Sequence, residues 1–295
     1  MDVLHCRAEP ERDRQPAWHV EAGGTAAAAK EEGIVSIGLH HPVANCLDYA
    51  LLLQEKYRLI ECNIVPAFSE ESTLDSVSFG CYQLMARYLQ DDKEKIIGLG
   101  SGLTLKKALQ RIDFDSQNTR CVALISAMDA DGQCNYYDDV PLLLTSKIKA
   151  KYYQWPAPRY AQTQEEYDMW CTSRLFRSVS AVARQADVIF VGIGPLGTQS
   201  PIFKDGFINQ AQMDEVTAQG GIGEIMGRFI DAEGGVVDSE INRMITSYDI
   251  RQNQCPRIAV ACGEYKRPAI LAALKGGWIN GLVTDEHTAR WLLTR

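Results

Sequence analysis

Residues 95–112, KIIGLGSGLTLKKALQRI, hold the pattern that decides the fold of this chain. An apolar run ends in the glycine-rich turn GLGSGLT (98–104), and a helical pattern begins at Thr104. Strands buried on both faces have continuous apolar runs, whereas helices repeat their apolar residues about every three to four positions. The stretch therefore predicts a strand over 95–100, a tight turn and a helix over 104–112.

Apolar runs and helical patterns alternate along the rest of the chain as well. Further strands are predicted at residues 34–40, 59–65, 120–126, 150–155, 187–194, 257–262 and 279–284. Further helices are predicted at residues 25–32, 45–57, 72–89, 173–186, 267–277 and 285–295. Strands that alternate with helices form parallel sheets covered on both faces. We therefore predict an α/β fold with a doubly wound, mostly parallel, Rossmann-like sheet, whose ligand binds beyond the carboxyl ends of the strands.

Three finer expectations follow from the same patterns. Ser72 and Asp75 are candidate caps for the helix over 72–89. The stretch from 195 to about 240 is rich in glycine and is predicted to be irregular. The helix over 173–186 is expected to bury one face, formed by Leu175, Val179, Val182 and Ala186.

Composition excludes several classes of protein. The chain has 295 residues and a formal net charge of −8, which argues against a basic nucleic-acid-binding surface over the whole protein. Its nine cysteines are odd in number and never form a C-x-x-C pair, which is typical of reduced cysteines in the cytoplasm. No apolar run is long enough for a membrane helix. We predict a cytoplasmic protein without a membrane partner.

The histidines do not indicate a catalytic or metal site. Four of the five precede the predicted α/β domain, which starts near residue 60, and the fifth, His287, lies in the last helix, where a surface position is expected. No histidine-based triad or metal cluster can be assembled from them, and the cysteines lack metal-ligand spacing. The sequence thus predicts no metal and no cofactor, and it favours a binding protein over a catalyst.

The turn GLGSGLT is the strongest candidate binding element. Exposed N–H groups at the start of a helix form an anion site, and glycine lets a ligand approach closely. Gly100 and Gly102 provide that access, while Ser101 and Thr104 add hydroxyl groups. No Gly-Lys-Ser/Thr follows, so the turn is not a nucleotide P-loop. The alternative is a tight turn without a ligand.

The second glycine string, GIGPLG (192–197), is not followed by the helix that a dinucleotide site requires. It is interpreted as a loop at the carboxyl end of a strand, able to form one wall of a pocket.

Charged candidates occur in three other places. Asp231, near Glu224 and Arg228, suits sugar hydroxyls because a carboxylate accepts several hydrogen bonds. Lys266 follows a strand in CGEYKRPAI (262–270) and is placed to meet a phosphate or another ligand oxygen, and Arg159 is a weaker candidate of the same kind. The alternatives are a solvated surface turn for Asp231 and exposed side chains for the two basic residues.

Several segments together resemble the SorC family of bacterial sugar-responsive transcriptional regulators. They are AKEEGIVSIGLHHP, IIGLGSGLT, ADVIFVGIGPLG, GGIGEIMGRFIDAEG and the closing stretch from IAVACGEYKRPAI to DEHTARWLL, and the match covers residues 28–295. The resemblance implies a fold similar to glucosamine-phosphate deaminase and ribose-phosphate isomerase. It further implies that the domain binds a phosphorylated sugar, which sets the oligomeric state, a dimer or a tetramer, and the affinity for operator DNA.

The resemblance also assigns roles to residues. It places Gly100, Ser101, Gly102 and Thr104 on the phosphate. It makes Asp231 the carboxylate that holds ligand hydroxyls and Lys266 the basic ligand contact. Residues 60–295 are then the effector-binding domain, and residues 28–59 are a remnant of a DNA-binding module with its linker helix.

One region departs from the family pattern. Family members carry a helix-turn-helix before the EEGIV segment, whereas residues 1–27 form a tail broken by Pro10, Pro16 and Gly23-Gly24. A disordered or aberrant tail is expected here, so binding of operator DNA requires an intact helix-turn-helix upstream. Two other functions stay open: a sugar-phosphate isomerase or deaminase with Asp231 or Glu224 as the proton shuttle, and an effector domain that acts without reading DNA.

Overall fold

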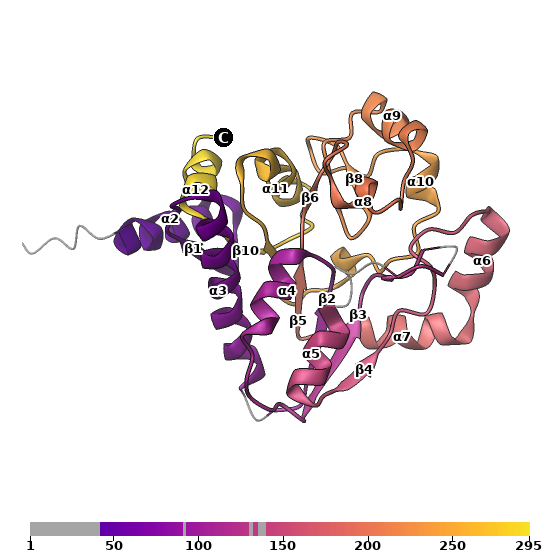
Figure 1. The fold of residues 1–295 in the computed structure, drawn as a ribbon, viewed down its shortest axis with the longest axis horizontal. Coiled ribbons are helices and arrows are strands. Elements are labelled where there is room, and N and C mark those ends of the chain that lie inside the picture. The colour runs from indigo at the N-terminus through magenta and orange to yellow at the C-terminus, as the bar shows by residue number, and fades with distance from the viewer. Residues whose placement is uncertain (1–41, 91–92, 130–131, 135–139) are drawn as a thin grey trace, which may run out of the picture. The chain divides into compact units, whose positions relative to one another are not determined.

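A parallel sheet of seven strands organises the unit formed by residues 41–295 (Figure 1). The computed structural model describes residues 42–90, 93–129, 132–134 and 140–295. The expected helix over 25–32 and strand over 34–40 lie outside these residues. The strand order is β1-β10-β9-β5-β2-β3-β4, and every neighbouring pair is parallel. The predicted α/β fold with a mostly parallel sheet is therefore confirmed.

The strands of the sheet lie close to their predicted positions. They are β1 (Glu61–Val65), β2 (Lys95–Leu99), β3 (Thr119–Ala123), β4 (Lys151–Tyr153), β5 (Val188–Val191), β9 (Arg257–Val260) and β10 (Gly281–Asp285). The chain runs outward from β2 through β3 to β4, then returns to the other side of β2 with β5. This reversal between β2 and β5 is a topological switch point, where ligands of open α/β sheets bind.

Helices cover both faces of the sheet. An apolar layer lies between each face of the sheet and its helices. The helices of the first layer are α3 (Glu70–Leu89), α4 (Leu103–Gln110) and α5 (Val140–Ile148). Those of the second layer are α2 (Pro42–Tyr57), α7 (Arg174–Arg184), α11 (Arg267–Lys275) and α12 (Glu286–Leu293). Successive strand residues alternate between the layers: Ile97 belongs to the first and Ile96 to the second. This period of two, with apolar residues on both sides, is why the strands appear as unbroken apolar runs.

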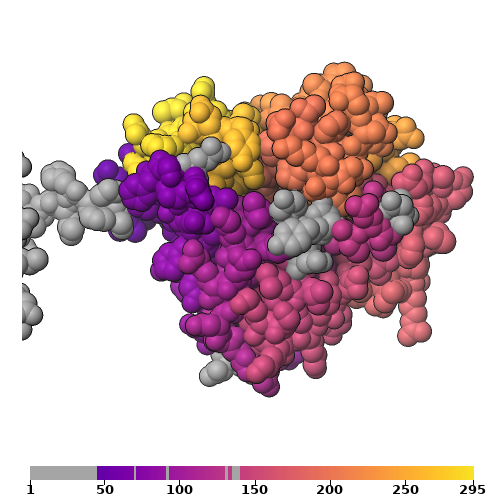
Figure 2. All heavy atoms as spheres, in the orientation of Figure 1, coloured from indigo at the N-terminus to yellow at the C-terminus, as the bar shows by residue number. Residues whose placement is uncertain are grey.

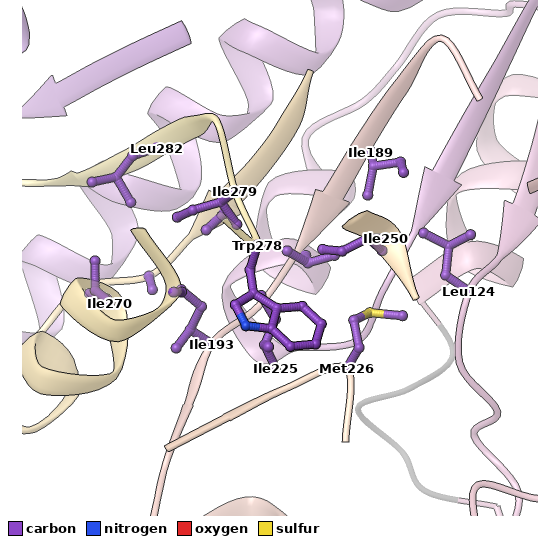
Figure 3. Packing of buried hydrophobic residues seen from close by; sticks show 14 of the residues in the cluster. Leu124, Ile189, Ile193, Ile225, Met226, Ile250, Ile270, Trp278, Ile279 and Leu282 are labelled. Carbon is purple, nitrogen blue, oxygen red and sulfur yellow. The ribbon is translucent and has the colours of Figure 1, made fainter. Parts of the chain in front are cut away.

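Trp278 occupies the middle of the second layer. It is fully buried, and Figure 3 shows its ring among Ile193, Ile225 and Met226, which come from the region that follows β5. Its Nε1 donates to the carbonyl oxygen of Gly234 at 2.8 Å. The large sheet and the glycine-rich region therefore share one apolar core.

The glycine-rich stretch after β5 is more ordered than its composition predicts. It contains β6 (Gly194–Pro195), β7 (Gly223–Ile225) and β8 (Arg228–Ile230), which form an antiparallel sheet. The short helices α8 (Pro201–Lys204), α9 (Gln210–Ala218) and α10 (Glu240–Arg243) accompany it, as the orange segment of Figure 1 shows. The expectation of an irregular stretch was wrong. Its glycines allow tight turns such as Met226-Gly227, where φ is +56° and +76°.

Several predicted details of the helices also need correction. The N-cap of α3 is Ser69, not Ser72 or Asp75: Ser69 and Ser72 form a capping box, with Ser72 at the third helical position. On α7, Leu175 is 62% exposed rather than buried, whereas Val179 is buried. Helix α5 and helix α6 (Gln164–Thr172) were not predicted. Helix α6 has no buried residue and therefore shows no helical apolar period. Helix α5 buries Val140, Leu144 and Ile148 on one face, but a short apolar run such as VPLLLTSKI does not separate a helix from a strand.

Helix α2 is tied to the last helix of the chain. Leu53 of α2 is fully buried, and the Lys56 ammonium group donates to the carbonyl oxygens of Leu292 and Leu293 at 3.3 and 3.0 Å. The Tyr57 hydroxyl donates to Leu292 O at 2.9 Å. Two 3₁₀ turns, η2 (Ile250–Gln252) and η3 (Glu264–Lys266), complete the described elements. Among the described residues, no helix has the length and apolar character needed to cross a membrane.

Candidate functional site

A cavity of about 320 Å³ opens at the topological switch point, and we call it the switch-point cavity. Its walls come from the turn after β2, the loop after β5, the segment that holds α8, strand β7 and η3. Figure 2 shows that the orange segment with the small sheet lies beside the yellow C-terminal segment, above the magenta part of the chain. Elements far apart in sequence thus converge at the carboxyl ends of the strands, as the fold predicts.

The turn after β2 forms one wall through its backbone. Helix α4 begins at Leu103, and its N-cap Gly102 has φ +139° and no side chain to cap the first-turn N–H groups. Open N–H groups at a helix start attract anions. Ser101 and Thr104 line the same wall. Gly192 faces this turn closely, because a Cβ atom there would lie 2.7 Å from Ser101 O.

Gly100 has a different position from the rest of the turn. It does not line the cavity, and its N–H donates to Phe190 O at 2.8 Å. A Cβ atom at this position would lie 2.8 Å from the Met226 sulfur. Gly100 therefore has a packing role: it lets Met226 approach the turn closely.

Arg159 and Lys266 line the cavity from two other directions. The buried Arg159 guanidinium donates to Ser126 O through Nε at 3.2 Å and Nη2 at 3.1 Å, and it lies 3.7 Å from the centre of the Phe207 ring. Lys266 is half-buried at the start of α11. Burial lowers the pKa of Lys266, while Cys262 and Glu224 oppose this change.

The structure also brings Glu224 and Lys204 to the cavity, together with Asp205. Glu224 accepts a hydrogen bond from Gly227 N at 2.9 Å. Burial raises its pKa, and the Gly227 N–H, Arg159 and Lys266 act in the opposite direction. Sequence reasoning named Glu224 as a charged residue near Asp231 and as an alternative proton shuttle. It missed Lys204 and Asp205, which lie in a segment without a recognisable motif.

Asp231 lies apart from these residues. It does not line the cavity, and its Oδ1 accepts hydrogen bonds from the N–H groups of Glu233 and Gly235 at 2.9 and 2.8 Å. Its carboxylate thus closes the turn after β8. The structure brings Ser101, Gly102, Thr104, Arg159 and Lys266 together at one cavity and leaves Asp231 outside. The convergence expected for Asp231 is not observed, because backbone donors already occupy its carboxylate.

Lys106 also needs correction. The helical pattern predicts that it faces solvent, but it is buried, with 9% of its surface exposed. Helix α4 packs between α3 and α5, so little of its surface reaches solvent. The expected solvent-facing position of Lys106 is therefore wrong.

Comparisons with known proteins establish the family. Residues 41–294 match the family model described as "Putative sugar-binding domain". The erythritol catabolism regulatory protein EryD of Brucella abortus is 28% identical over 277 residues, which cover 93% of this chain and 87% of the relative. The transcriptional regulator LsrR of Escherichia coli K12 is 28% identical over 274 residues, which cover 89% and 82% of the two chains.

Solved structures agree with this result. The full-length sorbitol operon regulator SorC from Klebsiella pneumoniae aligns with a TM-score of 0.73 at 25% identity, covering 91% of this chain and 87% of that one. A transcriptional regulator from Streptococcus pneumoniae aligns with a TM-score of 0.77 at 20% identity, which shows the shared fold; it covers 86% of this chain and 98% of that one. This chain belongs to the sugar-binding domain family of transcriptional regulators that includes the SorC-type proteins. The family is one of regulators, not of enzymes.

Proposed function

We propose that the unit of residues 41–295 binds a phosphorylated sugar in the switch-point cavity and thereby controls a transcriptional regulator. The observation that carries this proposal is the meeting of the open start of α4 with Arg159 and Lys266 at one cavity. With Lys204, the cavity has three basic side chains against the two carboxylates Asp205 and Glu224. This balance suits a ligand that is anionic and also rich in hydroxyl groups.

We propose that the two parts of the ligand, the phosphate and the sugar, lie on different walls of the cavity. The phosphate belongs at the turn of Ser101, Gly102 and Thr104, where N–H groups, hydroxyls and the helix dipole favour negative charge. The sugar hydroxyls then face Glu224 and Lys266 across the cavity. A neutral sugar gains less from the turn, so affinity should depend on the phosphate.

Control of transcription is proposed from the relatives. EryD and LsrR are named as regulators, and each aligns over most of its length. We propose that this protein acts in the cytoplasm as a homo-oligomer, and that the effector binds one quaternary arrangement better than another. The equilibrium between them then shifts by that difference in affinity, which changes binding to operator DNA. A DNA-reading module would have to lie before residue 42, outside the described residues.

The test measures the melting temperature of the wild type with a panel of sugar phosphates and the matching free sugars. Stabilisation by phosphates, and little by free sugars, is expected. Lys266→Met should weaken binding about 10- to 100-fold, the loss of a charge-assisted hydrogen bond. Lys275→Met is the matched control, because Lys275 lies on α11, pairs with Glu233 at 2.8 Å and is outside the cavity. A wild type that no sugar phosphate stabilises would contradict the proposal.

Two further measurements separate the functions that the sequence left open. A regulator should return its ligand unchanged, so turnover of any bound sugar phosphate would favour an isomerase or deaminase. Gel shift with operator DNA and size measurement, each with and without ligand, then test the proposed oligomer and its DNA binding. A ligand-dependent change in size without any DNA binding would indicate an effector domain that acts through partner chains.

A further inference from the structure

A second cavity of about 470 Å³ lies between α6, α7 and the segment 245–252, and we call it the arginine cavity. None of the described residues lines both this cavity and the switch-point cavity. Trp155 and Tyr248 belong to its wall, as does Phe176 of α7. The Trp155 ring lies edge to face against Phe176, with centroids 4.9 Å apart, and against Tyr248, at 6.2 Å. This wall is suited to a flat apolar group.

The charged groups of the arginine cavity are mostly positive. Arg177, Arg184 and Arg228 line it, against the single carboxylate of Asp249. Asp249 is already paired with Arg251, with Nη2 to Oδ2 at 2.7 Å. Burial raises the pKa of Asp249, but the hydrogen bonds and charge of Arg251 outweigh it and lower the pKa overall. The cavity therefore carries an excess of positive charge.

The three arginines differ in how firmly they are held. Arg228 donates to Ser247 Oγ, Ser247 O and Tyr248 O, which fixes its guanidinium. Arg184 contacts Gln252 Oε1 at 3.5 Å, a weak hydrogen bond. Arg177 has no ion-pair partner within the described part of the chain. One fixed and two available guanidinium groups thus face a cavity that holds no free carboxylate to neutralise them.

Two buried donors in the wall lack a partner. Trp155 is 2% exposed and Tyr248 4% exposed, and neither the Trp155 Nε1 nor the Tyr248 hydroxyl makes a hydrogen bond in the described structure. The Arg184 charge lies near the Tyr248 hydroxyl, but no hydrogen bond of normal geometry joins them. Buried polar atoms without a partner are rare and call for an explanation. Here the packing of the wall encloses both atoms, so the groups that can reach a ligand are the exposed arginines and Phe176.

We propose that the arginine cavity binds a small aromatic oxyanion, a carboxylate or a phosphate ester carried on an aromatic ring. Its charged oxygens lie on Arg177 and Arg184, and its ring lies against the half-buried Phe176. The guanidinium groups favour a ligand with charged oxygens, and the Phe176 ring favours a flat apolar body. This site is separate from the proposed sugar-phosphate site and does not depend on it.

The test titrates the full-length protein with phenyl phosphate and with benzoate, and measures binding by calorimetry. Inorganic phosphate and benzyl alcohol are the paired controls, since each lacks one half of the ligand. Binding of at least one aromatic anion, with little or no binding of the two controls, is expected. Phenyl phosphate binding without benzoate binding assigns the site to phosphate esters, and the reverse assigns it to carboxylates. Equal binding of inorganic phosphate or benzyl alcohol overturns the proposal, and so does a wild type that binds neither aromatic anion.

Variants locate the bound probe. Arg177→Gln and Arg184→Gln should each weaken binding roughly tenfold or more, because each removes a charge-assisted hydrogen bond. Both side chains are exposed on α7, so the fold should tolerate these changes. Arg174→Gln is the matched control, an exposed arginine of the same helix outside the cavity. An equal loss with Arg174→Gln overturns the proposal.

Two more variants keep the result distinct from the sugar-phosphate proposal. Phe176→Leu keeps an apolar side chain but removes the aromatic ring, and it should weaken binding of the probe while leaving sugar-phosphate stabilisation unchanged. Lys266→Met should weaken sugar-phosphate stabilisation while leaving binding of the probe unchanged. If Lys266→Met abolishes binding of phenyl phosphate, the probe occupies the switch-point cavity and the proposal fails.

Discussion

In the seven-stranded sheet, successive residues point into two apolar layers, whereas in the small sheet charged residues alternate with apolar ones. Phe190 of β5 is buried between Val188 and Val191, while β7 and β8 set Glu224 and Arg228 beside fully buried neighbours. Both regions line the switch-point cavity. The turns that follow the strands of the large sheet supply a backbone wall, and the small sheet supplies the Glu224 carboxylate. The difference teaches that one region sets where a ligand binds and the other helps to set which ligand it is.

The largest expected effect concerns whether the two regions unfold together. Phe190 and Phe229 are both fully buried, the first in the large sheet and the second in the cluster around the small one. Each Phe→Ala change should cost about 3–5 kcal/mol of unfolding free energy, because it leaves a cavity. Denaturant unfolding followed by circular dichroism measures this. One transition in both variants would show a single cooperative unit, and Leu142→Ala, at an exposed position, is the control.

A glycine at the junction of the regions gives the next effect. A Cβ atom at Gly192 would lie 2.7 Å from Ser101 O, so Gly192→Ala should shift the anion-binding turn at a cost of about 1–3 kcal/mol. Affinity for the sugar phosphate, measured by calorimetry, should also fall, because the displaced turn no longer presents its N–H groups in the same geometry. Gly235→Ala is the control, since its Cβ atom would lie 2.8 Å from Asp231 Oδ2, away from the cavity. An equal loss of affinity in both variants would argue against the role of the turn.

A pH titration tests the charged half of the cavity. Burial raises the pKa of Glu224 above its ordinary value of 4.5. Between the unfolded-state pKa of 4.5 and the higher folded-state pKa, the folded protein binds more protons at Glu224 than the unfolded chain does. The free energy of unfolding therefore falls as pH rises through this range. Glu224→Gln removes this dependence. The difference in unfolding free energy between wild type and variant should grow from about pH 4.5 upward, with a slope of at most one proton. Parallel stability curves would contradict the raised pKa.

The smallest effect is expected at Asp231. Its carboxylate closes a turn outside the cavity, so Asp231→Ala should cost about 0.5–1.5 kcal/mol of stability per lost hydrogen bond and leave sugar-phosphate affinity unchanged. Calorimetry and thermal unfolding measure the two quantities. A large loss of affinity with little loss of stability would show that Asp231 contacts the ligand, as the family resemblance implies.

The contrast between the regions also explains what the sequence could predict. The strands of the large sheet were found because burial on both faces gives apolar runs such as VIFV at 188–191. The small sheet has strands of two or three residues, too short for any periodicity, and turns that depend on glycine φ angles. Local sequence does not show which residues pair across such a sheet.

The site residues divide in the same way, into those that local sequence predicted and those that only the folded chain shows. Ser101, Gly102 and Thr104 were found because a strand, a glycine turn and a helix start are contiguous in the sequence. Asp231 was placed at the site because a carboxylate suits sugar hydroxyls and because of the family resemblance. Whether a carboxylate faces a ligand or its own backbone depends on the turn that follows it. Lys204 and Asp205 reach the cavity only through the path of the chain between β6 and β7.

The link between helices α2 and α12 joins the two ends of the described unit. Lys56 and Tyr57 hold the last carbonyl groups of α12, so the first helix of the unit is fixed by the final turn of the chain. Removing the residues from Leu292 onward would delete the acceptors of these three hydrogen bonds. A truncation at one end of the described unit would therefore weaken the packing of a helix that lies more than two hundred residues earlier in the sequence.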